Sequence, residues 1–124
     1  MSAQANRESA EAAYRAFADG DAAAAMEDMD DGVVWKARGN SSLSGTYKGK
    51  EEVATLWAKL GEKGLKTESH DFVAEGDKVV VLTTVTLDGE SDEAADVLTY
   101  NEEGKLIAFD QLGDPTIAAR VFPR

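Results

Sequence analysis

The spacing of apolar residues near the start of the chain is helical. Between positions 8 and 19 they recur at every third or fourth residue, which predicts an amphipathic helix that Gly20 ends. Its apolar face comprises Ala10, Ala13, Tyr14 and Phe17. Because such a helix buries one stripe of side chains, the rest of the fold must supply an apolar surface for it.

Two more helices are predicted in the first half of the chain. An Ala-rich stretch after Asp21, a good N-cap residue, favours a short helix that Asp30-Asp31-Gly32 ends. Residues 33–37 then form a short strand, and a polar loop over 38–45 leads toward a third helix with acidic residues in its first turn. The apolar stripe of that helix comprises Val53, Leu56, Trp57 and Leu60.

The second half of the chain has the character of strands. Residues 66–74 and 79–87 are predicted to be two strands, and 91–114 two more, joined by a turn at 101–104. Helices followed by strands predict an α+β fold, in which a curved mixed or antiparallel sheet and three helices from the N-terminal half enclose a hydrophobic cavity. We expect residues 1–124 to form a single domain.

The first strand of the last hairpin carries an acid among large apolar residues. Asp96, Leu98 and Tyr100 share one face if the strand alternates regularly. Asp96 is then either a solvated edge residue or a polar group inside a pocket, and the pattern leaves both interpretations open.

Composition narrows the possible partners. The chain has 24 acidic and 13 basic residues and a net charge of −11, so we expect no nucleic-acid partner. No apolar run is long enough to span a membrane and the N-terminus is polar, so we expect a cytoplasmic protein without membrane contact. With no cysteine and a single histidine, His70, we expect no disulfide, no metal and no cofactor.

Three segments together resemble the nuclear-transport-factor-2-like (NTF2-like) superfamily, and most closely its SnoaL-like and ketosteroid-isomerase-like branch. They are FADGDAAAAMEDMDDGVVW, SLSGTYKGKEEVATLW and ADVLTYNEEGKLIAF. The resemblance implies a cone-shaped α+β fold with a deep hydrophobic cavity, often in a homodimer that packs through the outer face of the sheet. Members include isomerases, polyketide cyclases, epoxide hydrolases, dehydratases and ligand-binding proteins, so the fold alone does not decide the function.

The ketosteroid-isomerase pattern is only partly present. Its protonated acid corresponds to Asp96, its helix-one tyrosine to Ala13 with Tyr14 one place away, and its network tyrosine to Trp57. Its general base corresponds to Lys36, which does not accept a proton at neutral pH unless its pKa is strongly lowered. Standard ketosteroid isomerisation is therefore not expected. Lys36 is either an exposed residue at a strand end or the partner of Asp96 in a buried ion pair.

The cyclase and epoxide-hydrolase branches imply an acid on the last strand, seven residues after the turn glycine. That position holds Gln111 here, and its neighbour Asp110 is an acid. Asp110 is a catalytic candidate only if it faces inward, because adjacent strand residues face opposite sides of a sheet. His70 is a possible base, although a lone strand histidine is more often structural.

Two functional hypotheses follow. In the preferred one, the cavity binds a small hydrophobic molecule, cyclic or carbonyl-bearing, with Asp96 and Asp110 as the catalytic candidates for isomerase, cyclase or hydrolase chemistry. The expected ligand-binding residues are Ala13, Phe17, Lys36, Trp57, Leu98, Phe109 and Gln111. In the alternative, side chains fill the interior and the protein is a non-catalytic homodimeric scaffold. A cavity of a few hundred cubic ångströms would favour the first hypothesis.

Overall fold

A computed structural model describes residues 2–113 and 115–124 of the chain. Four helices and six strands occur in these residues. The helices are α1 (Ala3–Ala18), α2 (Ala22–Ala25), α3 (Gly49–Glu62) and α4 (Thr116–Val121). The strands are β1 (Met29–Ala37), β2 (Gly45–Lys48), β3 (Lys66–Glu75), β4 (Lys78–Leu87), β5 (Glu90–Tyr100) and β6 (Leu106–Gly113). The last residue of the predicted hairpin, 114, lies outside the described residues.

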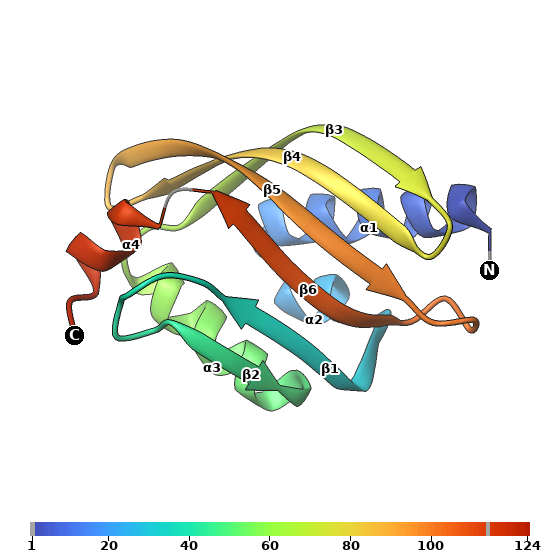
Figure 1. The fold of residues 1–124 in the computed structure, drawn as a ribbon, viewed down its shortest axis with the longest axis horizontal. Helices are drawn as coiled ribbons and strands as arrows, with labels where there is room; N and C mark the ends of the chain where they lie inside the picture. The colour runs from blue at the N-terminus through green and yellow to red at the C-terminus, as the bar shows by residue number, and fades with distance from the viewer. Residues whose placement is uncertain (1, 114) are drawn as a thin grey trace.

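The strands form one six-stranded sheet in the order β2-β1-β6-β5-β4-β3. All neighbouring pairs are antiparallel except β1 and β6, which are parallel. The sheet is strongly curved and does not close, with α1 packed behind β3 and β4 and α3 behind β1 and β2 (Figure 1). The predicted α+β cone with a mixed sheet is confirmed.

Several element boundaries differ from the predictions. Helix α1 begins at residue 3 because the Ser2 hydroxyl accepts a hydrogen bond from the Ala5 amide and caps the helix. Helix α2 is capped by Asp21 as expected, but it is only one turn long, and the chain already enters β1 at Met29. Strand β2 was missed, because its short polar sequence is held in place by pairing with β1 rather than by apolar periodicity.

The core lies between the helices and the concave face of the sheet. Val33 of β1, Val53 of α3, and Val79 and Val81 of β4 are fully buried, as is Ala10 of α1. Alternation along β5 puts Asp96, Leu98 and Tyr100 on this inner face, as predicted. In the described part of the chain, no helix is both long and apolar enough to cross a membrane.

Helix α4 covers one end of the cone (Figure 1). The Ser42 amide donates a hydrogen bond to the Phe122 carbonyl at 2.7 Å, and the Arg120 guanidinium pairs with Glu90 at the start of β5. Gly39, in the loop after β1, has a φ of +110°, and a Cβ added there would lie 2.5 Å from the Pro115 Cβ. This close approach requires glycine.

Substituting Gly39 with Ala should therefore loosen α4. The new methyl group must displace Pro115, so the amides of residues 116–122 should exchange with solvent about tenfold faster in hydrogen-exchange mass spectrometry. Gly45→Ala is the matched control, because Gly45 also has a positive φ of +147° but has no atom within 4 Å of the added Cβ. If the amides of α4 exchange equally fast in the two variants, the contact between Gly39 and Pro115 does not hold the helix.

Candidate functional site

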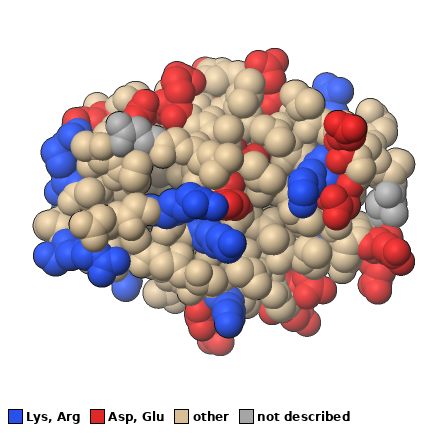
Figure 2. All heavy atoms as spheres, in the orientation of Figure 1, with Lys and Arg blue, Asp and Glu red and all other residues tan. Residues whose placement is uncertain are grey.

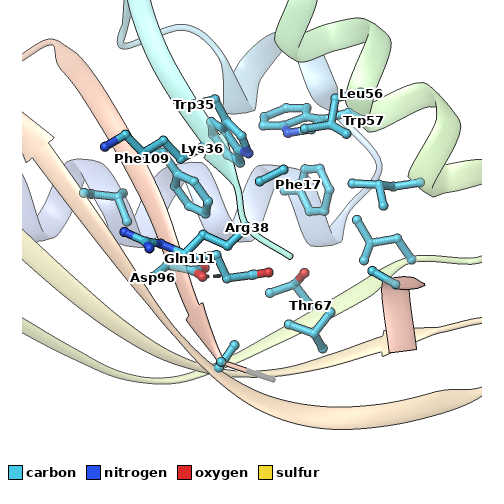
Figure 3. Close-up of a pocket in the computed structure, with 18 of the residues that line it drawn as sticks. Phe17, Trp35, Lys36, Arg38, Leu56, Trp57, Thr67, Asp96, Phe109 and Gln111 are labelled. Carbon is cyan, nitrogen blue, oxygen red and sulfur yellow. Dashed lines mark hydrogen bonds between the residues drawn. The ribbon is translucent and has the colours of Figure 1, made fainter. Parts of the chain in front are cut away.

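A cavity of about 230 Å³ lies between α1, α3 and the concave face of the sheet. Side chains from α1, β1, α3, β5 and β6 converge on it, as Figure 3 shows for Phe17, Trp35, Trp57, Asp96 and Phe109. Most of its wall is apolar. The curvature of the sheet and the helices that bridge it leave this space unfilled, which gives the volume a small organic molecule requires.

Four aromatic side chains form one wall of the cavity. The Trp35 and Phe109 rings, from the parallel pair β1 and β6, are stacked with centroids 3.5 Å apart and planes 9° apart. Trp57 of α3 packs edge-to-face against Trp35 and against Phe17 of α1, at 5.5 Å and 4.8 Å. Trp35 is only partly buried, and it both packs in this aromatic wall and lines the cavity.

The polar centre of the cavity is Asp96, of which only 2% is exposed. One carboxylate oxygen accepts a hydrogen bond from the Tyr14 hydroxyl. The other accepts one from the Gln111 amide nitrogen at 3.0 Å, and Figure 3 shows these two side chains together. Tyr14 comes from α1, Asp96 from β5 and Gln111 from β6, and Gln111 lies directly opposite Asp96 in the β5–β6 pair. The fold therefore fixes the direction of the carboxylate from two sides.

The surroundings of Asp96 make it titrate close to neutrality. Burial raises its pKa from 3.8 to about 6, and the hydrogen bonds from Tyr14 and Gln111 partly oppose this because they favour the charged form. Burial and the neighbouring carboxylate also raise the pKa of Tyr14 well above its usual value, so Tyr14 stays a neutral donor. Above about pH 6, the site is a hydrogen-bonded carboxylate in an apolar cavity, which can accept a hydrogen bond or a proton from a bound molecule.

The aligned tyrosine position on α1 was placed one residue too early. Both Ala13 and Tyr14 line the cavity, but it is the Tyr14 hydroxyl that reaches Asp96. A one-residue step rotates a helical side chain by about 100°, so a family correspondence that is one residue off points to the wrong side of the helix. Tyr14 also packs edge-to-face on Phe72 of β3, which fixes its ring.

The two remaining charged candidates lie away from Asp96. Lys36 is exposed and is paired in register with Asp110, so the buried ion pair between Lys36 and Asp96 is wrong. Asp110 does not line the cavity, because it alternates with the inward-facing Phe109 and Gln111. The Arg38 guanidinium donates two hydrogen bonds to Asp110, at 2.6 Å and 2.7 Å, and this lowers the pKa of that carboxyl.

His70 also lies outside the cavity. It stands at the irregular position of β3 between Ser69 and Asp71, and its Nε2 lies 2.6 Å from the Thr84 hydroxyl. That hydroxyl in turn donates a hydrogen bond to Glu93 at 3.0 Å. This row of polar groups crosses three strands on an exposed part of the sheet, consistent with a structural role for the histidine.

The expected site residues thus divide into two groups. The cavity is lined by Asp96 and by the expected ligand-binding residues Ala13, Phe17, Trp57, Leu98, Phe109 and Gln111. Lys36 only borders it from the end of β1, and Asp110 is separate from it. Their roles toward a ligand remain predictions.

Comparison with known families identifies the class of protein that this fold and cavity define. Residues 10–109 match the family described as a SnoaL-like domain, and the chain therefore belongs to that family, within the NTF2-like superfamily. Comparison with curated proteins gives no match.

Solved structures share the fold along nearly the whole chain. A protein of unknown function with a cystatin-like fold from Xanthomonas campestris is 22% identical, with a TM-score of 0.87 over 100% of both chains. Bal32a, from a soil-derived mobile gene cassette, is 22% identical, with a TM-score of 0.83 over 98% of both chains. TerC, co-crystallised with polyporic acid, is 24% identical, with a TM-score of 0.77 over 95% of this chain and 97% of its own. At these identities the likeness establishes the fold alone.

Proposed function

We propose that this SnoaL-like protein binds a small, cyclic, mostly apolar molecule in its cavity and that Asp96 performs acid/base chemistry on it. The observation that carries the proposal is a buried carboxylate, oriented by Tyr14 and Gln111, at the wall of an otherwise apolar cavity. A buried ionisable group costs stability, and such groups concentrate at binding and catalytic sites.

The shape of the cavity favours a ring. Its volume of about 230 Å³ suits a molecule of about two fused rings, smaller than a typical drug-sized ligand. The wall formed by Phe17, Trp35, Trp57 and Phe109 offers aromatic surface on which a flat molecule can pack. TerC, which shares the fold, was co-crystallised with polyporic acid, and this supports an organic ligand for the cavity.

The chemistry we propose is proton transfer beside a carbonyl group. Asp96 is mostly ionised above about pH 6, so it can remove a proton from a carbon next to a carbonyl or from a hydroxyl group. Tyr14 and Gln111 act as positioning residues, since each occupies one carboxylate oxygen and leaves further lone pairs for the ligand. Lys36 lies outside this arrangement, which again disfavours the standard ketosteroid-isomerase proton shuttle.

The test uses 2-tetralone, a bicyclic ketone with exchangeable protons beside its carbonyl. We expect the ketone to raise the melting temperature and the protein to speed deuterium incorporation beside the carbonyl by about a hundredfold, as positioned general bases do. Asp96→Asn should remove the exchange, whereas Asp110→Asn, which changes a carboxylate outside the cavity, should retain it. If neither 2-tetralone nor other bicyclic ketones bind, the proposed ligand class is wrong. If the ketone binds but Asp96→Asn exchanges protons as fast as the wild type, Asp96 is not the base.

We also propose that two copies of the chain associate through the outer face of the sheet. Val73, Leu82 and Leu112 are 60%, 42% and 44% exposed on this face, and Leu82 and Leu112 flank Ala95 in one cross-strand row. Figure 2 shows that the upper middle of this face is largely uncharged, whereas basic and acidic side chains gather near its centre and others lie around its margin. An apolar area of this kind is typical of a protein interface.

The homodimer leads to a specific prediction. Leu82→Glu should convert the protein from dimer to monomer in size-exclusion chromatography with light scattering, because a charge at the centre of the interface is desolvated without a partner. Ala58→Glu, on the exposed side of α3, should leave the dimer intact. A wild-type protein that is monomeric at about 100 μM would contradict the interface, since a stable dimer of standard interface size forms well below that concentration.

A further inference from the structure

Asp96 lacks a cationic partner. Both of its hydrogen-bond donors, Tyr14 and Gln111, are neutral, and no cation contributes to its pKa. A buried carboxylate in proteins is usually paired with a positive charge, because hydrogen bonds alone recover only part of the lost hydration. Within the described residues, the protein thus holds a buried negative charge without a counterion.

The nearest basic residues do not fill this role. Lys36 and Arg38 border the cavity from the end of β1, but both are exposed. Arg38 is held in a two-point contact with Asp110, and the charge of Lys36 also acts on Asp110. The positive charge of this region is therefore directed to the carboxylate outside the cavity.

Apart from Lys36, Arg38 and two tyrosines, the ionisable residues that line the cavity are acidic. Asp28 lies at one end, where it accepts a hydrogen bond from Ser9 and lies 3.7 Å from Lys105. Asp92 lies on β5 among the cavity-lining residues, whereas the carboxylate of the adjacent Glu93 accepts a hydrogen bond from Thr84 in the polar row outside the cavity. The net charge of −11 gives the protein as a whole a negative field, which attracts cations and repels anions.

The aromatic wall acts in the same direction. The faces of aromatic rings carry negative partial charge, and a cation within about 6 Å of a ring centroid is attracted to it. Four such rings pack together on one side of the cavity, and Asp96 lies among the residues that line the same space (Figure 3). Aromatic rings beside a single buried carboxylate are the groups that recognise an organic ammonium.

We infer that the cavity selects a cyclic molecule that carries a protonated amine, and that this ammonium group pairs with Asp96. The inference rests on the proposed function, because it concerns the same cavity and specifies the charge of its ligand. It separates this protein from one that binds an anionic ring, because the unpaired carboxylate of Asp96 and the net negative charge of the chain would repel an anion.

Three probes with the same ring and different charges test this inference. They are 2-naphthylmethylamine, which is a cation at neutral pH, 2-naphthalenemethanol, which is neutral, and 2-naphthoate, which is an anion. Isothermal titration at about pH 7.5 and low salt should show the amine binding at least about tenfold more tightly than the alcohol, and the naphthoate most weakly. Asp96→Asn should reduce the preference for the amine over the alcohol to about onefold, because the uncharged amide cannot pair with the ammonium group.

The pH dependence in the wild-type protein provides a second measurement that needs no variant. As pH falls from about 7.5 to 5, Asp96 gains a proton and the affinity for the amine should fall by about tenfold, whereas that for the alcohol should stay constant. Burial raises the pKa of Tyr14 and of Tyr100, and the hydrogen bonds to Asp110 raise the pKa of Arg38, so these groups do not change charge in this range, and Gln111 does not titrate.

The outcomes are distinguishable. If none of the three probes binds, the proposed ligand class fails together with the inference. If the alcohol or the naphthoate binds at least as tightly as the amine, the cavity function stands and the inference about charge is overturned. If the naphthoate binds tightly, the Arg38→Gln variant tests the cause. Loss of naphthoate binding in that variant would show that Arg38 leaves Asp110 and pairs with the ligand.

Discussion

Replacing Asp96 with Asn should make the protein more stable at neutral pH, although it removes the central polar group of the site. The difference between the ordinary carboxyl pKa of 3.8 and the value of about 6 in the folded protein corresponds to roughly 3 kcal/mol at most. Because Asn keeps a similar shape but forms weaker, uncharged hydrogen bonds with Tyr14 and Gln111, we expect a gain of about 1 to 3 kcal/mol at pH 8 in urea unfolding.

The sign follows from proton linkage. The folded state holds the Asp96 proton up to about pH 6, whereas the unfolded chain releases it near pH 3.8. Between these values the folded state binds more protons. The stabilisation of the folded state by the Asp96 proton is therefore fully present below about pH 3.8 and is lost as pH rises through about pH 6. The stability difference between Asp96→Asn and the wild type should therefore grow from pH 4 to about pH 7 and then level off.

Asp110→Asn is the matched control, because it changes a second carboxyl on the neighbouring strand. The Arg38 guanidinium lowers the pKa of Asp110, so this carboxyl stabilises the folded state above its unfolded pKa and loses that contribution as pH falls. Relative to the wild type, Asp96→Asn should thus become more stable as pH rises, whereas Asp110→Asn should become less stable as pH rises. If Asp96→Asn destabilises the protein at pH 8, the hydrogen bonds from Tyr14 and Gln111 outweigh the cost of burying the charge.

Such a result would also bear on function. A residue whose replacement raises stability is retained for another reason, and binding or catalysis is the usual one. Combined with loss of proton exchange or of the preference for an amine, the gain in stability would separate a functional carboxylate from one that only completes the core.

The features that the sequence predicts well are those set by local pattern. Alternation alone predicts which residues of β5 face inward, because Leu98 and Tyr100 are buried on the same side as Asp96. The turn after β5 followed from Gly104, whose φ is +79°, and from Asn101, whose side chain accepts two backbone hydrogen bonds.

The features that the sequence does not settle depend on registration between distant segments. Tyr14 and Asp96 are 82 residues apart, and only the packing of α1 on the sheet decides that Tyr14, rather than Ala13, reaches the carboxylate. Lys36 and Asp110 face each other because β1 and β6 are parallel neighbours, which the order of elements does not reveal. Asp110 points outward because its neighbour Phe109 is buried on the inner face, and adjacent residues of β6 face opposite sides of the sheet.

Replacing Trp35 with Ala should cause the second large change, a loss of about 3 kcal/mol in the free energy of unfolding. Truncation of a core tryptophan typically costs about 3 to 5 kcal/mol, and Trp35 falls near the lower end because it is only partly buried. Its ring is stacked on Phe109 and contacts Trp57, so the substitution removes two aromatic contacts and enlarges the cavity. Urea unfolding monitored by circular dichroism measures the loss.

Trp35→Phe separates stacking from simple volume. It retains a ring against Phe109, so we expect it to lose about half as much stability as Trp35→Ala. A double-mutant cycle between Trp35 and Phe109 should give a coupling of about 0.5 to 1.5 kcal/mol, as for other aromatic pairs. A loss below about 1 kcal/mol for Trp35→Ala would mean that the rest of the core holds the aromatic wall in place. In that case the stacked pair would contribute to ligand binding rather than to folding, and Trp35→Ala should weaken binding of the naphthalene probes while the fold persists.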